Sequence, residues 1–341
     1  MQNFTKLLPS RLELLRELDK RKALHFQEEL QEELLRLEKG LAGEELVHTY
    51  LKKYGKKDWV VLRNIWLQYY GSFEIDLLLL TRAGIYVFEV KNYTGKYEFS
   101  NNQCLINGKI VGNNAVHQAQ KALVNLRGIL SSYSNFNRLH LTGLLAFVGE
   151  HHCVKLHDEP RDIEVVMRNT LRARIWEILE EERNYQGRSV NVQACKQFFE
   201  KIQQTNPLKL NDLSEVTLSS IQPGVCCSRC GNFNVVFKNK RLTCSCGMYE
   251  PREETIIRTI CEYGVINYEK DLTTRELVDF FDGDVSRTCI LGCLKKHFNK
   301  IGHNKSTKYI NQRLPFSQLR DQFDLTLPRY LRLDHLPYSK E

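Results

Sequence analysis

Charged side chains interrupt two neighbouring apolar segments in the first third of the chain. Asp76 lies within the apolar run 73–80, and Glu89 and Lys91 lie at the end of the next apolar run. Alternate residues of a strand share a face, so Glu89 and Lys91 are predicted to point the same way. If the two segments are adjacent strands, the three side chains converge at one edge of a sheet.

Two carboxylates and a main-chain carbonyl at such an edge form an oxygen site suited to Mg²⁺ or Mn²⁺. The ion can lower the pKa of a bound water and stabilise charge on a phosphate under attack, and a nearby lysine can orient that water. The alternative is an ion pair between Glu89 and Lys91, which fits the same spacing. Burying an unpaired charge in an apolar strand is costly, which favours a metal or catalytic role.

The segments around these residues predict the elements that position them. A helix, three strands, a second helix and a fourth strand are expected in that order, α-β-β-β-α-β. Their predicted ranges are 43–54, 59–67, 73–80, 85–90, 115–130 and 141–148. A further strand and two helices complete this α/β domain, at 163–167, near 170–182 and at 192–203.

Three motifs in this region resemble the NERD (nuclease-related) domain. They are GEELV at 43–47, EID at 74–76 and GIYVFEVKNYTG at 84–95, and the resemblance covers about residues 40–150. That family belongs to the PD-(D/E)XK nuclease superfamily, whose restriction-endonuclease-like core has the same α-β-β-β-α-β order. The family commonly has histidine directly after the motif aspartate, where this chain has Leu77. Because the central charges are present, we interpret this difference as tuning rather than inactivation.

The resemblance also implies roles for individual residues. Asp76 and Glu89 would bind the metal, and Lys91 would be the catalytic lysine. Glu44, on the first helix, would be a further acidic residue of the site. Gln118, on the helix after the strands, matches a glutamine often found there in the superfamily.

The chain contains 11 cysteines, an odd number, and several of them gather in residues 226–246. Two cysteine pairs, C-x₂-C and C-x-C, are each followed by glycine, and 13 residues separate the second cysteine of the first pair from the first cysteine of the second pair. Thiolates at this spacing can close a structural Zn²⁺ site of the zinc-ribbon kind, with a hairpin in between. Ordinary buried cysteines are the alternative, and Cys226 could replace the first ligand. The predicted ligands are Cys227, Cys230, Cys244 and Cys246.

The C-terminal part is basic, and the whole chain has a formal net charge of +8. Residues 285–320 contain eight basic residues and no Asp or Glu, which suits a polyanion such as DNA. A helix capped by Asp284 or Ser286 follows two shorter helices and precedes a short strand, an order that resembles a winged-helix or helix-turn-helix unit. A protein-binding surface is the alternative. The predicted nucleic-acid contacts are Arg287, Lys295, Lys296 and Lys300.

The predicted organisation has five parts. They are an N-terminal amphipathic helix, a nuclease-like domain, a linker, a zinc ribbon and a basic helical module, at 1–40, 41–204, 205–224, 225–250 and 251–341. The spacing of Leu30, Leu34, Leu37 and Leu41 gives this helix one apolar face, which is expected to pack against its own domain. The helix could also pair as a coiled coil, which makes a homo-oligomer an expectation to test. No run approaches the roughly 20 apolar residues of a membrane span, and no secretory signal is recognisable, so we expect a cytoplasmic protein without a membrane partner.

These features favour a Mg²⁺-dependent nuclease that hydrolyses phosphodiester bonds, with DNA as the expected partner. The zinc ribbon and basic module would direct it to the nucleic acid. A second hypothesis is a nucleic-acid-binding protein that keeps the nuclease fold as a non-catalytic scaffold. A third is an assembly protein that oligomerises through its N-terminal helix. The charges at Asp76, Glu89 and Lys91 favour the first hypothesis over the second.

Overall fold

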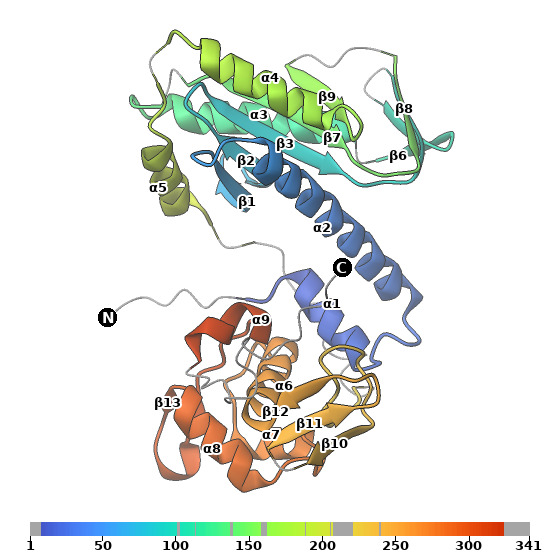
Figure 1. Cartoon of the computed structure of the whole chain (residues 1–341), viewed down its shortest axis with the longest axis vertical. Helices are drawn as coiled ribbons and strands as arrows, with labels where there is room; N and C mark the ends of the chain where they lie inside the picture. The colour runs from blue at the N-terminus through green and yellow to red at the C-terminus, as the bar shows by residue number, and fades with distance from the viewer. Residues whose placement is uncertain are drawn as a thin grey trace, which may run out of the picture. The chain divides into compact units, whose positions relative to one another are not determined.

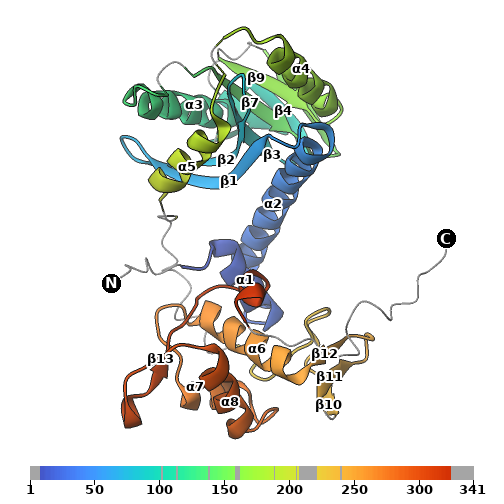
Figure 2. The ribbon, with the colours of Figure 1, turned by 60° about the vertical axis from the view of Figure 1, so that its left-hand side comes forward.

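The computed structural model divides the chain into two compact units. One comprises Leu35–Leu208, and the other combines Met1–Leu34 with Lys209–Glu341. Both are drawn in Figures 1 and 2, and each is described by itself. The described residues are 8–100, 103–112, 114–136, 139–157, 162–187, 189–204, 206, 221–238 and 240–323.

A five-stranded sheet in the order β1-β2-β3-β7-β9 forms the centre of the first unit. The strands β1, β2 and β3 pair antiparallel, whereas β3, β7 and β9 run parallel to one another. Every one of these strands is rich in Val, Ile, Leu and aromatic residues, as a sheet buried on both faces requires. The strands span Val60–Gln68, Ser72–Leu80, Ile85–Lys91, Leu141–Phe147 and Ile163–Met167.

Helices cover both faces of this sheet (Figure 1). On β3, Ile85 and Val87 pack into the core that contains α3 and α5, while Tyr86 and Phe88 pack into the core that contains α2 and α4. This alternation follows from the two-residue period of a strand. The helices span Glu28–Tyr54 (α2), Ala115–Ser131 (α3), Leu171–Asn184 (α4) and Val192–Ile202 (α5).

The mixed α/β class expected from the sequence is confirmed. Along the chain, α2, β1, β2 and β3 are followed by three strands that the pattern analysis did not predict, and then by α3 and β7. The added strands join β8 in a separate sheet of order β6-β5-β4-β8. These strands span Gly95–Ser100 (β4), Gln103–Ile106 (β5), Lys109–Val111 (β6) and His152–Leu156 (β8).

The single N-terminal helix predicted for residues 1–40 is wrong. Helix α1 (Arg11–Lys20) begins with a capping box at Ser10 and ends before Lys22, whose φ is 60°. Ala23 N then donates to Leu18 O across this left-handed turn, which closes the helix. A second helix, α2, starts at Glu28 and continues into the first unit.

The second unit joins α1 to a three-stranded antiparallel sheet and three helices, α6 to α8. The hairpin predicted between the cysteine pairs is β10 with β11. After α8, a short hairpin of β13 and β14 follows, and Leu272 forms a bridge with Tyr309. The predicted linker 205–224 lies largely outside the described residues. The elements span Val235–Lys238 (β10), Arg241–Cys244 (β11), Tyr249–Pro251 (β12), Arg252–Ile266 (α6), Thr274–Phe280 (α7), Arg287–His297 (α8), Lys300–Ile301 (β13), Lys308–Tyr309 (β14) and Phe316–Leu319 (α9), with 3₁₀ turns at Asn304–Ser306 and Arg320–Gln322.

A single apolar core holds this unit together. Ile256 and Ile260 of α6, Leu277 of α7 and Ile290 and Leu294 of α8 are all buried in it. Among the described helices of the whole chain, none combines the length and the hydropathy that crossing a bilayer demands.

Candidate active site and metal centre

The structure brings Asp76, Glu89 and Lys91 together where β2 and β3 separate. The paired register of these strands ends at Leu77 opposite Phe88. Beyond this point Asp76 Oδ2 accepts a hydrogen bond of 2.7 Å from the backbone N–H of Val90. Lys91 Nζ lies 2.6 Å from Glu89 Oε1, and both of these side chains are about nine-tenths buried. The ion pair considered from the sequence therefore exists, next to a buried aspartate.

Glu44 of α2 faces the same group of charges. Burial, followed by the negative charge of Glu74, raises the pKa of this carboxyl to about 7, and Glu89 adds to the rise. Its Oε2 atom is buried and accepts no hydrogen bond from any described residue. The helix approaches closely because residue 43 is glycine: a Cβ there would lie 2.7 Å from Cβ of Asn92.

Asn64 is a member of the site that sequence reasoning missed. It lies on β1, opposite Asp76, at the one position where the β1–β2 register is interrupted between Arg63 and Ile65. Its φ is 50°, a left-handed conformation that asparagine tolerates better than most residues. Its side chain acts on Glu44 by lowering the pKa of that carboxyl. A polar residue inside the apolar segment 59–67 was the available signal, and such backbone outliers gather at functional sites.

The donor set fits a divalent cation. Burial, followed by the charge of Glu89, raises the pKa of Asp76 well above its usual value, so the ionised carboxylate is disfavoured here and a bound cation would favour it. Carboxylate oxygens in such a place are the ligands that Mg²⁺ and Mn²⁺ prefer. Among the described residues, only four cysteines bring at least three ligand atoms within 4.8 Å of one another, so the carboxylates are less tightly gathered than the thiols.

Gln118 lies apart from these contacts. It is in the first turns of α3, its side chain is exposed, and its backbone N–H donates to Asn114 O. Among the described residues, no hydrogen bond or ion pair joins its side chain to Asp76, Glu89 or Lys91. Its role in the site stays a prediction.

Comparison with known proteins supports a nuclease-related fold for the region that contains these charges. The family model of the nuclease-related domain (NERD) matches residues 39–148. The resemblance expected from the motifs is therefore confirmed for this region, which we call the nuclease-related domain. An uncharacterized protein of Bacillus anthracis is 39% identical over 59 residues, which are 17% of this chain and 28% of that protein. The matched part of this chain thus spans less than a third of that relative. No solved structure matches this chain.

Outside the nuclease-related domain, the four predicted cysteines form one group. Cys227 Sγ lies 3.6 Å from Cys246 Sγ, and Cys230 Sγ lies 3.6 Å from Cys244 Sγ. All four sulfur atoms lie within 4.8 Å of one another. Thiolates at about 2.3 Å from a tetrahedral Zn²⁺ are about 3.8 Å apart, so this group could bind zinc.

Local geometry explains the cysteine spacing. Gly231 and Gly247 have φ values of 70° and 82°, and this left-handed conformation turns each cysteine pair back on itself. The choice between Cys226 and Cys227 is also decided. Cys226 Sγ lies 3.9 Å from Glu262 Oε2, away from the group, whereas Cys227 belongs to it.

The four predicted nucleic-acid contacts differ in their surroundings. Arg287, Lys295 and Lys300 are exposed on α8 and at the start of the β13–β14 hairpin. Lys296 is also exposed, but its Nζ lies 2.8 Å from Glu253 Oε1. Ser286, rather than Asp284, caps the helix by accepting a hydrogen bond from the Cys289 N–H. Three of the four predicted cations are therefore presented without a carboxylate partner among the described residues.

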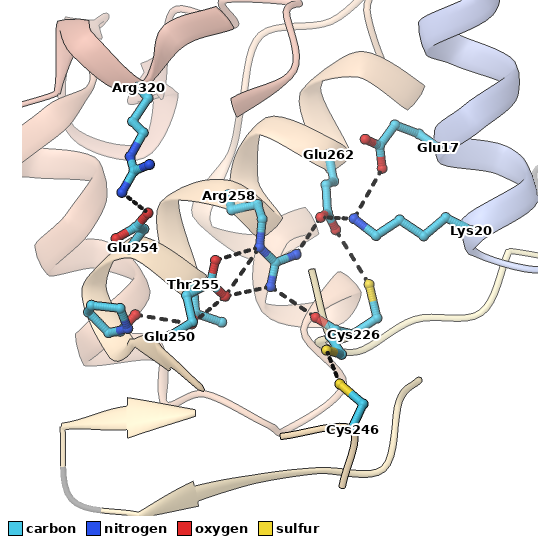
Figure 3. A network of polar contacts seen from close by, with 12 residues as sticks. Glu17, Lys20, Cys226, Cys246, Glu250, Glu254, Thr255, Arg258, Glu262 and Arg320 are labelled. Atoms are coloured by element: carbon cyan, nitrogen blue, oxygen red, sulfur yellow. Dashed lines mark hydrogen bonds and ion pairs between the residues drawn. The ribbon is translucent and has the colours of Figure 1, made fainter. Parts of the chain in front are cut away.

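A buried ion network fastens α1 to α6, as Figure 3 shows. Glu262 of α6 is 2% exposed and accepts hydrogen bonds from Arg258 Nη1 at 2.5 Å and from Arg21 Nη2 at 2.6 Å. Lys20 forms a further ion pair with the same carboxylate. No sequence spacing could have indicated this contact, because Arg21 and Glu262 are 241 residues apart.

The same network holds the zinc-ribbon segment in place (Figure 3). Arg258 Nη2 donates to Cys226 O at 2.9 Å and to Glu250 Oε2 at 2.8 Å. The fully buried Arg21 donates to Gly224 O at 3.0 Å and lies 4.1 Å from the ring centroid of Phe280. Two buried guanidinium groups therefore fix the backbone directly before the first metal-binding cysteine.

Proposed function

We propose that the nuclease-related domain is a divalent-metal-dependent nuclease that hydrolyses phosphodiester bonds of nucleic acid. The observation that carries this proposal is the buried convergence of Asp76, Glu89 and Lys91 at the point where β2 and β3 separate. Buried carboxyls with raised pKa values, as at Asp76 and Glu44, are costly to a fold and are typical of sites that bind a cation. The strand and helix order around them supports a PD-(D/E)XK core, with β4 to β6 as an insertion.

Each residue has a distinct part in this proposal. Asp76 and Glu89 would hold the ion, and Glu44, with its unpartnered Oε2, would complete the acidic face. When bound, Mg²⁺ or Mn²⁺ would activate a water and stabilise charge on the phosphate. Burial lowers the pKa of Lys91, but the charge and hydrogen bond of Glu89, together with Tyr93 and Asp76, outweigh burial, and the net pKa is raised. Lys91 therefore stays protonated and would neutralise the charge that develops on the phosphate.

We further propose that the second unit delivers the domain to DNA. The order of α6, the Leu272 bridge, α7, α8 and the β13–β14 hairpin supports a winged helix, with α8 as the recognition helix. Structural zinc held by the four cysteines would brace the adjoining ribbon. Thiols bind zinc only when reduced, so a cytoplasmic location suits this proposal.

Cleavage by matched variants tests the nuclease. Supercoiled and linear DNA, single-stranded DNA and RNA are incubated with Mg²⁺, Mn²⁺ or EDTA. We expect Asp76→Asn and Glu89→Gln to reduce metal-dependent cleavage about 100-fold or more, since each 1.4 kcal/mol of lost transition-state stabilisation is a factor of ten. Asp58→Asn, which changes an exposed carboxylate of the same unit, should cleave normally.

Thermal unfolding of the same variants separates lost chemistry from lost folding. Asp76→Asn removes one of several like charges and should leave the midpoint unchanged or raise it. Glu89→Gln should stay folded with a lower midpoint, because it leaves Lys91 buried without its ion-pair partner. Full cleavage by both Asp76→Asn and Glu89→Gln would overturn the nuclease. If the wild type binds nucleic acid but cleaves none of the substrates with either metal, the scaffold function replaces it.

A further inference from the structure

A cavity of about 800 Å³ opens in the nuclease-related unit at the carboxyl ends of β7 and β9. No part of the proposed catalytic group lines it. Its walls come from α2, from the start of β8, and from the turn between β9 and α4. Its lining includes Tyr50, Tyr54, Glu150, His152, Arg168 and Arg172.

The cavity lies at the same sheet edge as the candidate active site. Lys91 at the end of β3 pairs with Phe147 at the end of β7, which pairs with Met167 at the end of β9. Met167 lines the cavity, two strand spacings from Lys91, or about 10 Å. That is about three nucleotides along one strand of a duplex. Ligands of α/β sheets bind at the carboxyl ends of their strands.

One wall of the cavity suits an anion. Arg168 and Arg172 flank the N-terminus of α4, whose first turn contains no acidic residue. Its N-cap, Thr170, makes no side-chain capping bond, because its hydroxyl bonds the backbone of Met167 instead. The first N–H groups of the helix are thus left available to an oxygen ligand, next to two guanidinium groups.

The other wall suits an aromatic ring. Tyr50 and Tyr54 of α2 lie edge to face with ring centroids 5.4 Å apart. The guanidinium of Arg172 is 5.0 Å from the Tyr54 centroid, and the ammonium of Lys53 is 5.3 Å from it. Nearby, Nδ1 of His152 is buried and bonds to no described residue. Tyrosine faces and arginine planes are the surfaces on which nucleobases stack.

We propose that this cavity binds one unstacked nucleotide of the substrate strand, its phosphate at the N-terminus of α4 and its base against Tyr50 and Tyr54. The proposal rests on the nuclease function argued above and names its substrate class as single-stranded nucleic acid. A base inside a duplex is stacked on both faces and cannot enter without being extruded, which costs free energy. Single strands and frayed ends therefore bind more tightly than a blunt duplex.

Glu150 also lines the cavity, and removing its charge should change the affinity for nucleic acid in the opposite direction to removing an arginine. Its Oε1 lies 2.9 Å from Arg168 Nη1, and its side chain is 66% exposed. Such an exposed ion pair is weak, so a phosphate can replace the carboxylate. Removing the charge of Glu150 therefore favours the ligand, whereas removing the charge of Arg172 disfavours it.

Binding is measured on the full chain carrying Asp76→Asn, so that the probe stays intact. The probes are a fluorescent single-stranded DNA of about ten nucleotides, the RNA of the same sequence, and a blunt DNA hairpin. Adding Arg172→Gln should weaken single-strand binding about tenfold, and adding Glu150→Gln should tighten it about threefold. Arg183→Gln, an exposed position in the last turn of α4, is the control and should change nothing.

The outcomes separate this proposal from the nuclease itself. Two results overturn nucleotide binding in the cavity even if the wild type cleaves DNA. One is an unchanged affinity for single strands in both cavity variants, and the other is a change in affinity for the hairpin equal to that for single strands. Opposite shifts in Arg172→Gln and Glu150→Gln for single strands alone support it even if no cleavage is found. Comparing the DNA and RNA probes then decides which sugar the cavity accepts.

Discussion

Glu17 gives the second unit a pH dependence that can be worked out from its surroundings. The side chain lies on α1 beside the buried ion network of α6 (Figure 3). Burial, followed by the negative charge of Glu262, raises the pKa of Glu17 from 4.5 to about 7. Its Oε2 accepts no hydrogen bond from a described residue, and Lys20 Nζ is 3.8 Å away. The folded unit therefore favours the protonated form of Glu17.

The sign and the size of the effect follow from this shift. A raised pKa in the folded state means that stability is full at low pH and is lost as the pH rises through about 7. At 1.36 kcal/mol per pKa unit, the difference between pH 5 and pH 8 is about 2 kcal/mol. Glu262 does not titrate in this window, because Arg258, Lys20 and Arg21 outweigh its burial and hold its pKa far below the usual value.

Glu17→Gln should remove most of this dependence. We expect the variant to be about 2 kcal/mol more stable than the wild type at pH 8 and nearly equal to it at pH 5. Urea unfolding followed by far-UV circular dichroism at both pH values measures this. The chain has three tryptophans, at 59, 66 and 176, and all of them lie in the other unit, Leu35–Leu208. The unfolding transition followed by tryptophan fluorescence should therefore be the same in Glu17→Gln and in the wild type. Asp19→Asn, an exposed position on α1, is the matched control.

One result would refute the reasoning. If wild type and Glu17→Gln lose the same stability between pH 5 and pH 8, Glu17 does not carry the proton that the burial argument assigns to it. A change in the tryptophan transition would instead mean that the variant disturbs residues outside its own unit.

Two further predictions concern the second unit. Protein purified without added metal should contain one Zn²⁺ per chain by elemental analysis, and Cys246→Ser should lower that content; folded, reduced wild type without zinc would contradict the site. For DNA, Lys295→Gln with Lys300→Gln should flatten the slope of log K against log salt by about 1.8, since each phosphate contact contributes about 0.9. Lys296→Gln should change the slope much less, because the ammonium of Lys296 already pairs with Glu253. If Lys296→Gln changes the slope as much as the double variant does, α8 is not the DNA-binding helix.

The acidic group could be predicted because it depends on local rules. The two-residue period of a strand places Glu89 and Lys91 on one face, and adjacent strands then bring Asp76 close. The cysteine pairs could be predicted for the same reason, since each pair is a short turn around one metal position. A site whose residues are brought together by their spacing within one strand or one turn can be predicted from the sequence.

Features that depend on distant contacts were not predictable. The left-handed Asn64 occupies a break in the β1–β2 register, and no pattern within its own strand specifies that break. The strands β4 to β6 are short, and they read as a loop because they hold few apolar residues in alternation. The cavity depends on three elements meeting at one sheet edge, so neither Tyr54 nor Arg172 could be connected with it from sequence.

The N-terminal segment shows what periodicity alone leaves open. It predicted one long helix, whereas the structure has α1 and α2. The apolar face of α1, formed by Leu14, Leu15 and Leu18, is buried within the chain's own second unit. Oligomerisation through α1 stays a prediction, and any such contact must use other side chains. Lys20 and Arg21 would be read as exposed charges, but they neutralise Glu262 in the core.

This pairing also decides which parts of the chain form a unit. Without Lys20 and Arg21, the buried carboxylate of Glu262 would keep Arg258 as its one described cation. Removing partners of a buried charge costs about 3–5 kcal/mol, a large share of the stability of a small domain. The folding of the zinc-ribbon segment and of the helices after it therefore depends on Lys20 and Arg21, although the nuclease-related domain lies between them in the sequence.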